Sequence, residues 1–363
     1  MQPDRLRDLP LRDYRPRSSL RLPEHHVPRA RFPAVDAHNH LGRWLTDGWS
    51  APDTGELVDV MDACGIDAIV NLDGMWGDEL QANLDRYDRA RPGRFATFCQ
   101  LDWTTTAEPG FGERLAAQLH ACVAEGARGV KVWKQLGLRI RDDRGALVMP
   151  DDERLDPVWA AAADAGAPVT IHVADPVAFF EPLDETNERL EELLANPDWW
   201  FGDRDVFPPF ERIIESFESL VARHPATTFI GAHVACNVED LAWVDRMLST
   251  YPNLYADVAA RIAELGRQPR ASRALMLQHP DRIVFGTDLF PPAREIYAIH
   301  FRFLETADEH FPYDPDEPPS QGRWAISGLE LPDDVLRAVY GDNTRRLIAG
   351  LGGDDPRAPG STT

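Results

Sequence analysis

Short apolar runs alternate with longer helical patterns along most of the chain. The runs predict strands at Ala34–His40, Asp67–Leu72, Phe95–Leu101, Gly129–Trp133, Pro168–His172, Thr227–Ala232, Asn253–Asp257 and Arg282–Gly286. Between them, apolar residues recur every three or four positions. This spacing predicts helices at Thr54–Cys64, Asp78–Arg91, Glu113–Glu125, Asp156–Ala165, Phe210–Arg223, Glu239–Ser249 and Arg270–Gln278.

Eight strand-then-helix units in series indicate an α/β protein with a parallel sheet, and most simply a (β/α)8 TIM barrel. A doubly wound open sheet is the alternative. It lacks its usual support, because no Gly-x-Gly-x-x-Gly follows the first strand.

The expected organisation is an N-terminal arm (1–33), one barrel domain (34–349) and a disordered tail (350–363). Two stretches interrupt the barrel pattern: an insertion at 175–209 after the fifth strand and a Pro-rich excursion at 310–332 before a closing helix, Asp333–Ile348. The insertion carries many aromatic residues, which predicts a partly ordered cap over the barrel mouth. A contact between copies or an anchor to the barrel rim would explain the aromatics equally well.

Histidines and one aspartate lie where strands end. In Asp36-Ala37-His38-Asn39-His40, alternation puts Asp36, His38 and His40 on one side, with the two histidine Cα atoms roughly 6–7 Å apart. His172, His233 and Asp288 follow the fifth, sixth and eighth strands, at the end where barrel enzymes assemble their sites. Taken singly, each histidine could be structural. Together they suit zinc, or manganese or iron.

Composition narrows the class of protein. The chain has 363 residues, 43% hydrophobic, with a formal charge of −22, which disfavours binding to nucleic acid or an anionic membrane. It has no apolar run of membrane-spanning length and no signal-peptide pattern, so a cytoplasmic protein is expected. The four scattered cysteines indicate neither a thiolate metal site nor disulfides. A homodimer is a candidate assembly.

The only two lysines among 38 basic residues, Lys131 and Lys134, lie in one short segment with Trp133. Chance clustering is the alternative explanation. We expect Lys131 and Trp133 to line the pocket and Lys134 to point away into an ion pair. Arg261, after the seventh strand, is a candidate for gripping a substrate carboxylate. The alternative is that Arg261 pairs with Asp257 or Glu264.

The Asp-x-His-x-His strand, the two later histidines and Gly286-Thr287-Asp288 resemble the amidohydrolase superfamily over residues 33–349. The details are most similar to the branch containing aminocarboxymuconate-semialdehyde decarboxylase. The resemblance implies that His38, His40, His172 and Asp288 bind metal and that Asp288 also accepts a proton. His233 would bind a second ion or contact water and substrate.

The expected function is a metal-dependent hydrolase that uses a metal-activated water on a C–O or C–N bond of a small organic acid, ester, lactone or amide. Asp36 is expected to orient a metal ligand. The alternative is non-oxidative decarboxylation of an aromatic or dienoic acid, and a more remote one is a catalytically silent binding barrel. One divalent ion is expected, with zinc preferred over manganese or iron. In binuclear superfamily members a carboxylated lysine bridges two ions, and Lys131 would supply it in the less favoured two-ion version.

Overall fold

The computed structural model describes residues 6–10, 13–46 and 48–351. Its strands are β1 (Ala34–Asn39), β2 (Ile66–Asn71), β3 (Phe95–Thr97), β4 (Val130–Val132), β5 (Val169–Ile171), β6 (Phe229–Gly231), β7 (Leu254–Asp257) and β8 (Ile283–Val284). All neighbouring pairs are parallel, in two ladders ordered β1-β2-β3 and β4-β5-β6-β7-β8. All eight predicted strands are present, several of them shorter than expected.

Backbone pairing continues across the gap between the two ladders on both sides. Cys99 pairs with Val130 beyond the end of β3, and the Lys131 amide donates to the Cys99 carbonyl at 2.8 Å. On the other side Asn39 pairs with Leu289, and the Asp288 amide donates to the His38 carbonyl at 2.8 Å. These two seams close the predicted eight-stranded barrel.

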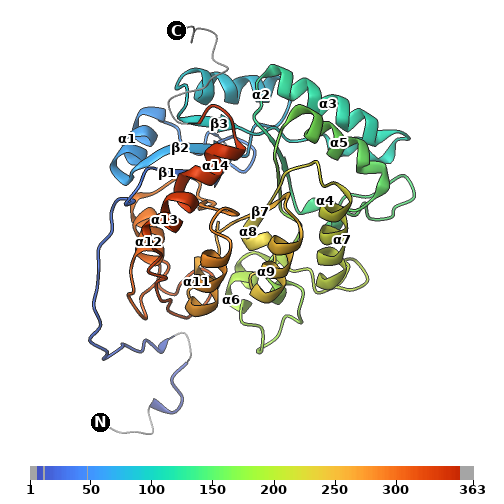
Figure 1. The fold of residues 1–363 in the computed structure, drawn as a ribbon. Helices are drawn as coiled ribbons and strands as arrows, with labels where there is room; N and C mark the ends of the chain where they lie inside the picture. Colours follow the sequence, from blue (N-terminus) through green and yellow to red (C-terminus); the bar gives the residue numbers. More distant parts are fainter. Residues whose placement is uncertain (1–5, 11–12, 47, 352–363) are drawn as a thin grey trace, which may run out of the picture.

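Helices surround the barrel (Figure 1). Those of eight residues or more are α1 (Thr54–Cys64), α2 (Gly77–Leu84), α3 (Phe111–Glu125), α5 (Asp156–Ala165), α7 (Phe210–Arg223), α9 (Leu241–Thr250), α11 (Pro269–Gln278) and α12 (Arg294–Glu305). The shorter ones are α4 (Gln135–Leu138), α6 (Leu190–Ala195), α8 (Ala232–Ala235), α10 (Ile262–Leu265), α13 (Asp333–Arg337) and α14 (Asn343–Leu347).

The sequence prediction contained no helix for the segment that forms α12. Its buried side chains Tyr297, Phe301 and Leu304 recur at spacings of four and three and pack on the core. The predicted closing helix is found as α13, a π-helical turn at Ala338–Asp342 and α14, in unbroken succession.

A β-bulge in β1 decides which of its side chains reach the barrel mouth. Asp36 pairs with Ile69 and Asn39 with Asn71, so three steps along β1 match two along β2. One extra residue reverses the alternation of sides. Asp36 therefore lies on a different face from the one that sequence alternation assigned to it.

Segments outside the barrel pattern are tied to it by hydrogen bonds. In the N-terminal arm, the Arg31 amide donates to Glu305 at the end of α12 at 2.9 Å. In the insertion after β5, the buried Arg189 pairs with Glu264 of α10 and with Glu192 of α6. The predicted tail lies outside the described residues from 352 onward. No described helix is long and apolar enough to cross a membrane.

Candidate active site

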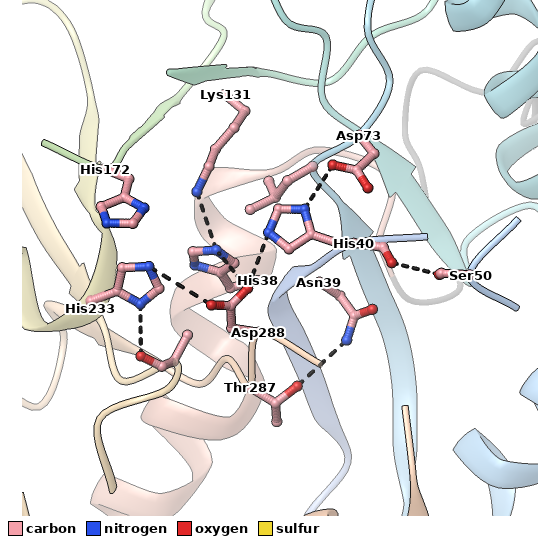
Figure 2. Close-up of polar contacts among 12 residues, drawn as sticks. His38, Asn39, His40, Ser50, Asp73, Lys131, His172, His233, Thr287 and Asp288 are labelled. Carbon is pink, nitrogen blue, oxygen red and sulfur yellow. Dashed lines mark hydrogen bonds and ion pairs between the residues drawn. The ribbon is translucent and has the colours of Figure 1, made fainter. Parts of the chain in front are cut away.

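The seam between β1 and the segment after β8 brings two histidines and a carboxylate together (Figure 2). Asp288 Oδ1 lies 3.1 Å from His40 Nε2 and 3.6 Å from His38 Nε2. One donor atom from each of these residues lies within 4.8 Å of the other two, a spacing that a single metal ion could bridge. The predicted convergence of His38, His40 and Asp288 is therefore present in the fold.

A carboxylate outside this cluster orients each histidine. His38 Nδ1 lies 2.7 Å from Asp257 Oδ2, and His40 Nδ1 lies 2.7 Å from Asp73 Oδ1. A carboxylate at Nδ1 fixes the proton there and leaves the Nε2 lone pair facing the centre, the arrangement typical of metal-binding histidines. The donor set therefore fits a divalent cation.

Asp36 does not orient an imidazole, contrary to the sequence expectation. Its carboxylate accepts hydrogen bonds from the Thr287 amide and hydroxyl and, at 2.9 Å, from the Tyr297 hydroxyl of α12. The bulge in β1 turns the side chain to that face. Asp36 thus fastens β1 to the segment after β8 from outside the cluster.

His233 projects into the cluster from a left-handed turn. The residues His233, Val234, Ala235 and Cys236 have φ of 57°, 60°, 56° and 59°. Such conformations are costly for residues with a side chain and concentrate at functional sites. His233 Nδ1 lies 2.9 Å from the Ala259 carbonyl, which can only accept, so Nδ1 carries the proton. The Nε2 lone pair faces Asp288 Oδ2 at 3.9 Å.

His172 lies beside His233, with ring centroids 4.4 Å apart, but its Nε2 faces Asp175 Oδ1 at 3.2 Å. It belongs to neither of the groups of described residues whose donor atoms lie within 4.8 Å of one another. Asp175 is itself paired with Lys134, so the expected ion pair of Lys134 exists. Lys134 and Asp175 both line the cavity above the metal cluster, however, whereas the sequence led us to expect that Lys134 would point away from it.

Lys131 is fully buried behind the histidines. Its Nζ lies 3.2 Å from His38 Nε2, and the ring of Trp133 lies 5.0 Å away. The cavity above the cluster is lined by Trp133 but not by Lys131, which was also expected to line it. Burial lowers the pKa of the amine below its usual value, against the opposing effect of Asp288.

Burial and charge divide the histidines into two classes. Burial lowers the pKa of His38, His233 and His172, that of His172 to about 4. Burial also opposes the charged form of His40, but Asp73 and Asp288 outweigh it and raise the pKa of His40 to about 9. His38 and His40 hold the pKa of Asp288 well below its usual range, although partial desolvation of the carboxylate works in the opposite direction. Without metal, His40 is therefore a cation beside an ionised Asp288 at neutral pH.

A cavity of about 500 Å³ opens above this cluster. Its walls include Arg261, Trp133, Glu192, Trp199 and Phe290, so the insertion after β5 contributes to the lining. The Arg261 guanidinium donates to the Ala260 carbonyl at 2.8 Å. Among the described residues no carboxylate lies within ion-pair distance of it: Asp257 bonds His38, and Glu264 pairs with Arg189. Glu192, in the same wall, also pairs with Arg189, and Arg261 acts on it at longer range, opposing the rise in its pKa that burial causes.

Sequence reasoning missed the carboxylates that orient the histidines. Asp73 comes two residues after β2 and Asp257 is the last residue of β7, so both lie at carboxyl ends of strands. The same positional rule that selected the histidines would have selected them. Asp175, three residues after His172, carries the same signal.

The sequence profile described as "Amidohydrolase" matches residues 35–349. The chain belongs to the amidohydrolase family. As a member of this family it is identified as an enzyme, and the recognition made from the sequence motifs is confirmed. A search of curated protein sequences finds no match.

Solved structures share the fold at low sequence identity. A 2,6-dihydroxybenzoate decarboxylase complexed with 2,6-dihydroxybenzoate is 16% identical, with a TM-score of 0.55, over 87% of this chain and 99% of that one. The enzyme of that name from Rhizobium is 17% identical, with a TM-score of 0.54, over 87% and 98%. A dihydroxybenzoic acid decarboxylase from Polaromonas sp. JS666, with bound manganese and the inhibitor 2-nitroresorcinol, is 16% identical, with a TM-score of 0.52, over 87% and 96%. These similarities confirm the barrel.

Proposed function

We propose that this amidohydrolase-family enzyme is a metal-dependent decarboxylase that removes CO2 from an aromatic or dienoic acid without oxidation. The observation that carries the proposal is Arg261, a guanidinium in the pocket wall with no carboxylate partner among the described residues. A guanidinium so placed suits an anionic substrate, which it can grip through two parallel hydrogen bonds. The similarity in fold to dihydroxybenzoate decarboxylases supports the same class.

The proposed metal ligands are the Nε2 atoms of His38 and His40 together with Asp288, and either His172 or His233 completes the set. Nitrogen and carboxylate donors without thiolate suit zinc, manganese or iron. A divalent ion held there would act as a Lewis acid and polarise substrate oxygens.

The protein's own residues supply orientation and a proton. Arg261 holds the acid, and the aromatic walls at Trp133 and Phe290 restrict the ring. The C–C bond to the carboxyl group breaks, and its electron pair stays on the ring or diene carbon that carried that group. A proton from water replaces the departing CO2 and leaves hydroxide to the solvent, and Asp288, whose side chain lines the cavity, is placed to pass that proton on.

Hydrolysis, the function expected first from the sequence, is the second candidate. Hydrolysis is favoured by two unprotonated groups that line the same cavity, the ionised Asp288 and the Nε2 lone pair of His233. Such a pair would accept the proton of an attacking water rather than donate one.

One experiment distinguishes the two candidates. The manganese-loaded enzyme is incubated in H₂¹⁸O with hydroxybenzoates and, separately, with aryl esters, lactones and amides. Decarboxylation gives CO2 and an arene from the first set, whereas hydrolysis places ¹⁸O in the acid product of the second. Arg261→Gln should raise KM for the acids at least about tenfold, since a bidentate charged contact is lost. Product formation from neutral esters alone would refute the decarboxylase proposal.

Metal analysis tests the site itself. We expect about one equivalent of bound ion, loss of binding in His38→Ala, and loss of turnover in Asp288→Asn. Binding should weaken in whichever of His172→Ala and His233→Ala removes the last ligand. Two equivalents in the native enzyme that fall to one in Lys131→Met would instead establish the carboxylated-lysine version. Full turnover by Asp288→Asn would contradict its role in proton transfer.

A further inference from the structure

A second hollow lies beside the active-site cavity, on the same face of the barrel. It encloses about 420 Å³ between the loops that follow β1, β2, β3 and β4. Four tryptophans contribute to its walls: Trp44, Trp76, Trp103 and Trp133. The metal cluster and Arg261 do not border it. We refer to it as the tryptophan pocket.

The tryptophan pocket adjoins the active-site cavity. Trp44, Trp133 and Gln135 line both spaces. The rings of Trp44 and Trp133 have centroids 4.5 Å apart, and Trp133 also lies 4.9 Å from the ring of His40. A ligand that extended from the cluster past these tryptophans would enter the second space.

Two polar atoms at the junction have no partner. Trp133 Nε1, a donor, and Gln135 Oε1, an acceptor, are both buried without a hydrogen bond among the described residues. A buried polar atom left unpaired is costly, so both atoms would gain from a hydrogen bond that a ligand supplied once a side chain had shifted to expose them. An amide or a hydroxyl group can both accept and donate, so it could bond to either atom.

The charged side chains of the tryptophan pocket are already satisfied locally. Asp102 accepts from the Thr104 amide and hydroxyl. The Arg141 guanidinium donates to the carbonyls of Gly145 and Val206. Much of the remaining wall is apolar, formed by the four tryptophans together with aliphatic side chains such as Met75 and Ile140, and such a wall favours a planar uncharged ring.

We propose that the substrate has two parts: an acid that reacts at the metal cluster and an uncharged aromatic group that binds in the tryptophan pocket, joined through an amide- or hydroxyl-bearing link at Trp133 and Gln135. This inference rests on the proposed function for the acid part. The aromatic part rests on the shape and chemistry of the second pocket alone. A single benzene ring with its carboxylate would leave that pocket unfilled.

The test compares two ligands that differ only in the tail. The manganese-loaded full-length protein is titrated by calorimetry with 4-acetamidobenzoate and with 4-benzamidobenzoate, which share the acid and the amide link. Burying the extra ring should tighten Kd by about 10- to 100-fold. Ala107→Trp, which fills the tryptophan pocket, should reduce this gain to less than about threefold and leave the Kd of the acetamide unchanged.

Two further variants serve as controls, one inside the tryptophan pocket and one outside it. Trp103 borders the tryptophan pocket but not the active-site cavity. Trp103→Ala should enlarge the tryptophan pocket and so reduce the gain in affinity from the extra ring. Trp243 lies on α9, outside both spaces, so Trp243→Ala should alter neither Kd. Equal Kd values for the two ligands in the native protein would overturn the inference, as would a gain that survives Ala107→Trp.

A neutral pair separates this inference from the proposed function. Acetanilide and benzanilide carry the same link and tails without the carboxylate. If neither acid binds, acid recognition has failed, but tighter binding of benzanilide than of acetanilide, abolished by Ala107→Trp, would still support the tryptophan pocket. Equal affinity for the two anilides would count against it.

Discussion

Binding of the metal should release a proton from His40. Without metal, Asp73 and Asp288 keep this imidazole charged by raising its pKa to about 9. A metal ion accepts only the neutral ring, so the proton must leave on binding. At pH 7 roughly one molecule in 100 holds the neutral form, which weakens apparent affinity about 100-fold, or about 2.7 kcal/mol, relative to pH above 9.

The assay is calorimetric titration of manganese(II) into metal-free protein at pH 7. Two buffers with different ionisation enthalpies give the number of protons released, which should be about one per ion. Between pH 6.5 and 8, log Kd should fall with a slope close to −1, because the pKa lies above that range.

Asp73→Asn is the matched variant. An asparagine oxygen can still accept the His40 Nδ1 proton, but the negative charge that favours the imidazolium is gone. Fewer protons should then be released at pH 7, and the slope should flatten. Release of no proton by the native protein, or the same number from both proteins, would refute the assignment of the charge to His40.

Three further predictions concern stability. Burial raises the pKa of Asp36 to about 6, so the folded protein holds this proton more tightly than the unfolded chain, and stability should fall as pH rises from about 4 to 6. Urea unfolding of metal-free Asp36→Asn should lack this decline, worth about 3 kcal/mol, and parallel curves would contradict it. Arg189→Ala strands buried Glu264 and should cost about 3–5 kcal/mol in the same assay, whereas a loss below about 1 would show the pair to be dispensable. Manganese should raise Tm in the native protein but not in His38→Ala, and an equal rise in both would exclude His38 as a ligand.

The barrel could be predicted because strand and helix periods are local properties of the chain. The seam residues His38, His40 and Asp288 followed from one rule, that barrel sites form at carboxyl ends of strands. α12 escaped prediction although its apolar residues keep helical spacing.

Partners of the site residues were harder to predict, because they depend on register and packing. A single extra residue in β1 moved Asp36 away from the imidazoles, and alternation alone carries no sign of a bulge. His172 turns its Nε2 to Asp175 across a loop, a choice of rotamer that sequence spacing does not encode. The pairing of Arg189 with Glu264 joins residues 75 positions apart.

The seam between β1 and the segment after β8 has a consequence for how metal binding would affect the backbone. His38 and Asp288 belong to opposite sides of the seam and are joined there by the hydrogen bond that the Asp288 amide donates to the His38 carbonyl. An ion bound between their side chains would link the two sides of this seam. Deuterium uptake at the Asp288 amide should therefore be slower in the metal-loaded protein than in the metal-free protein.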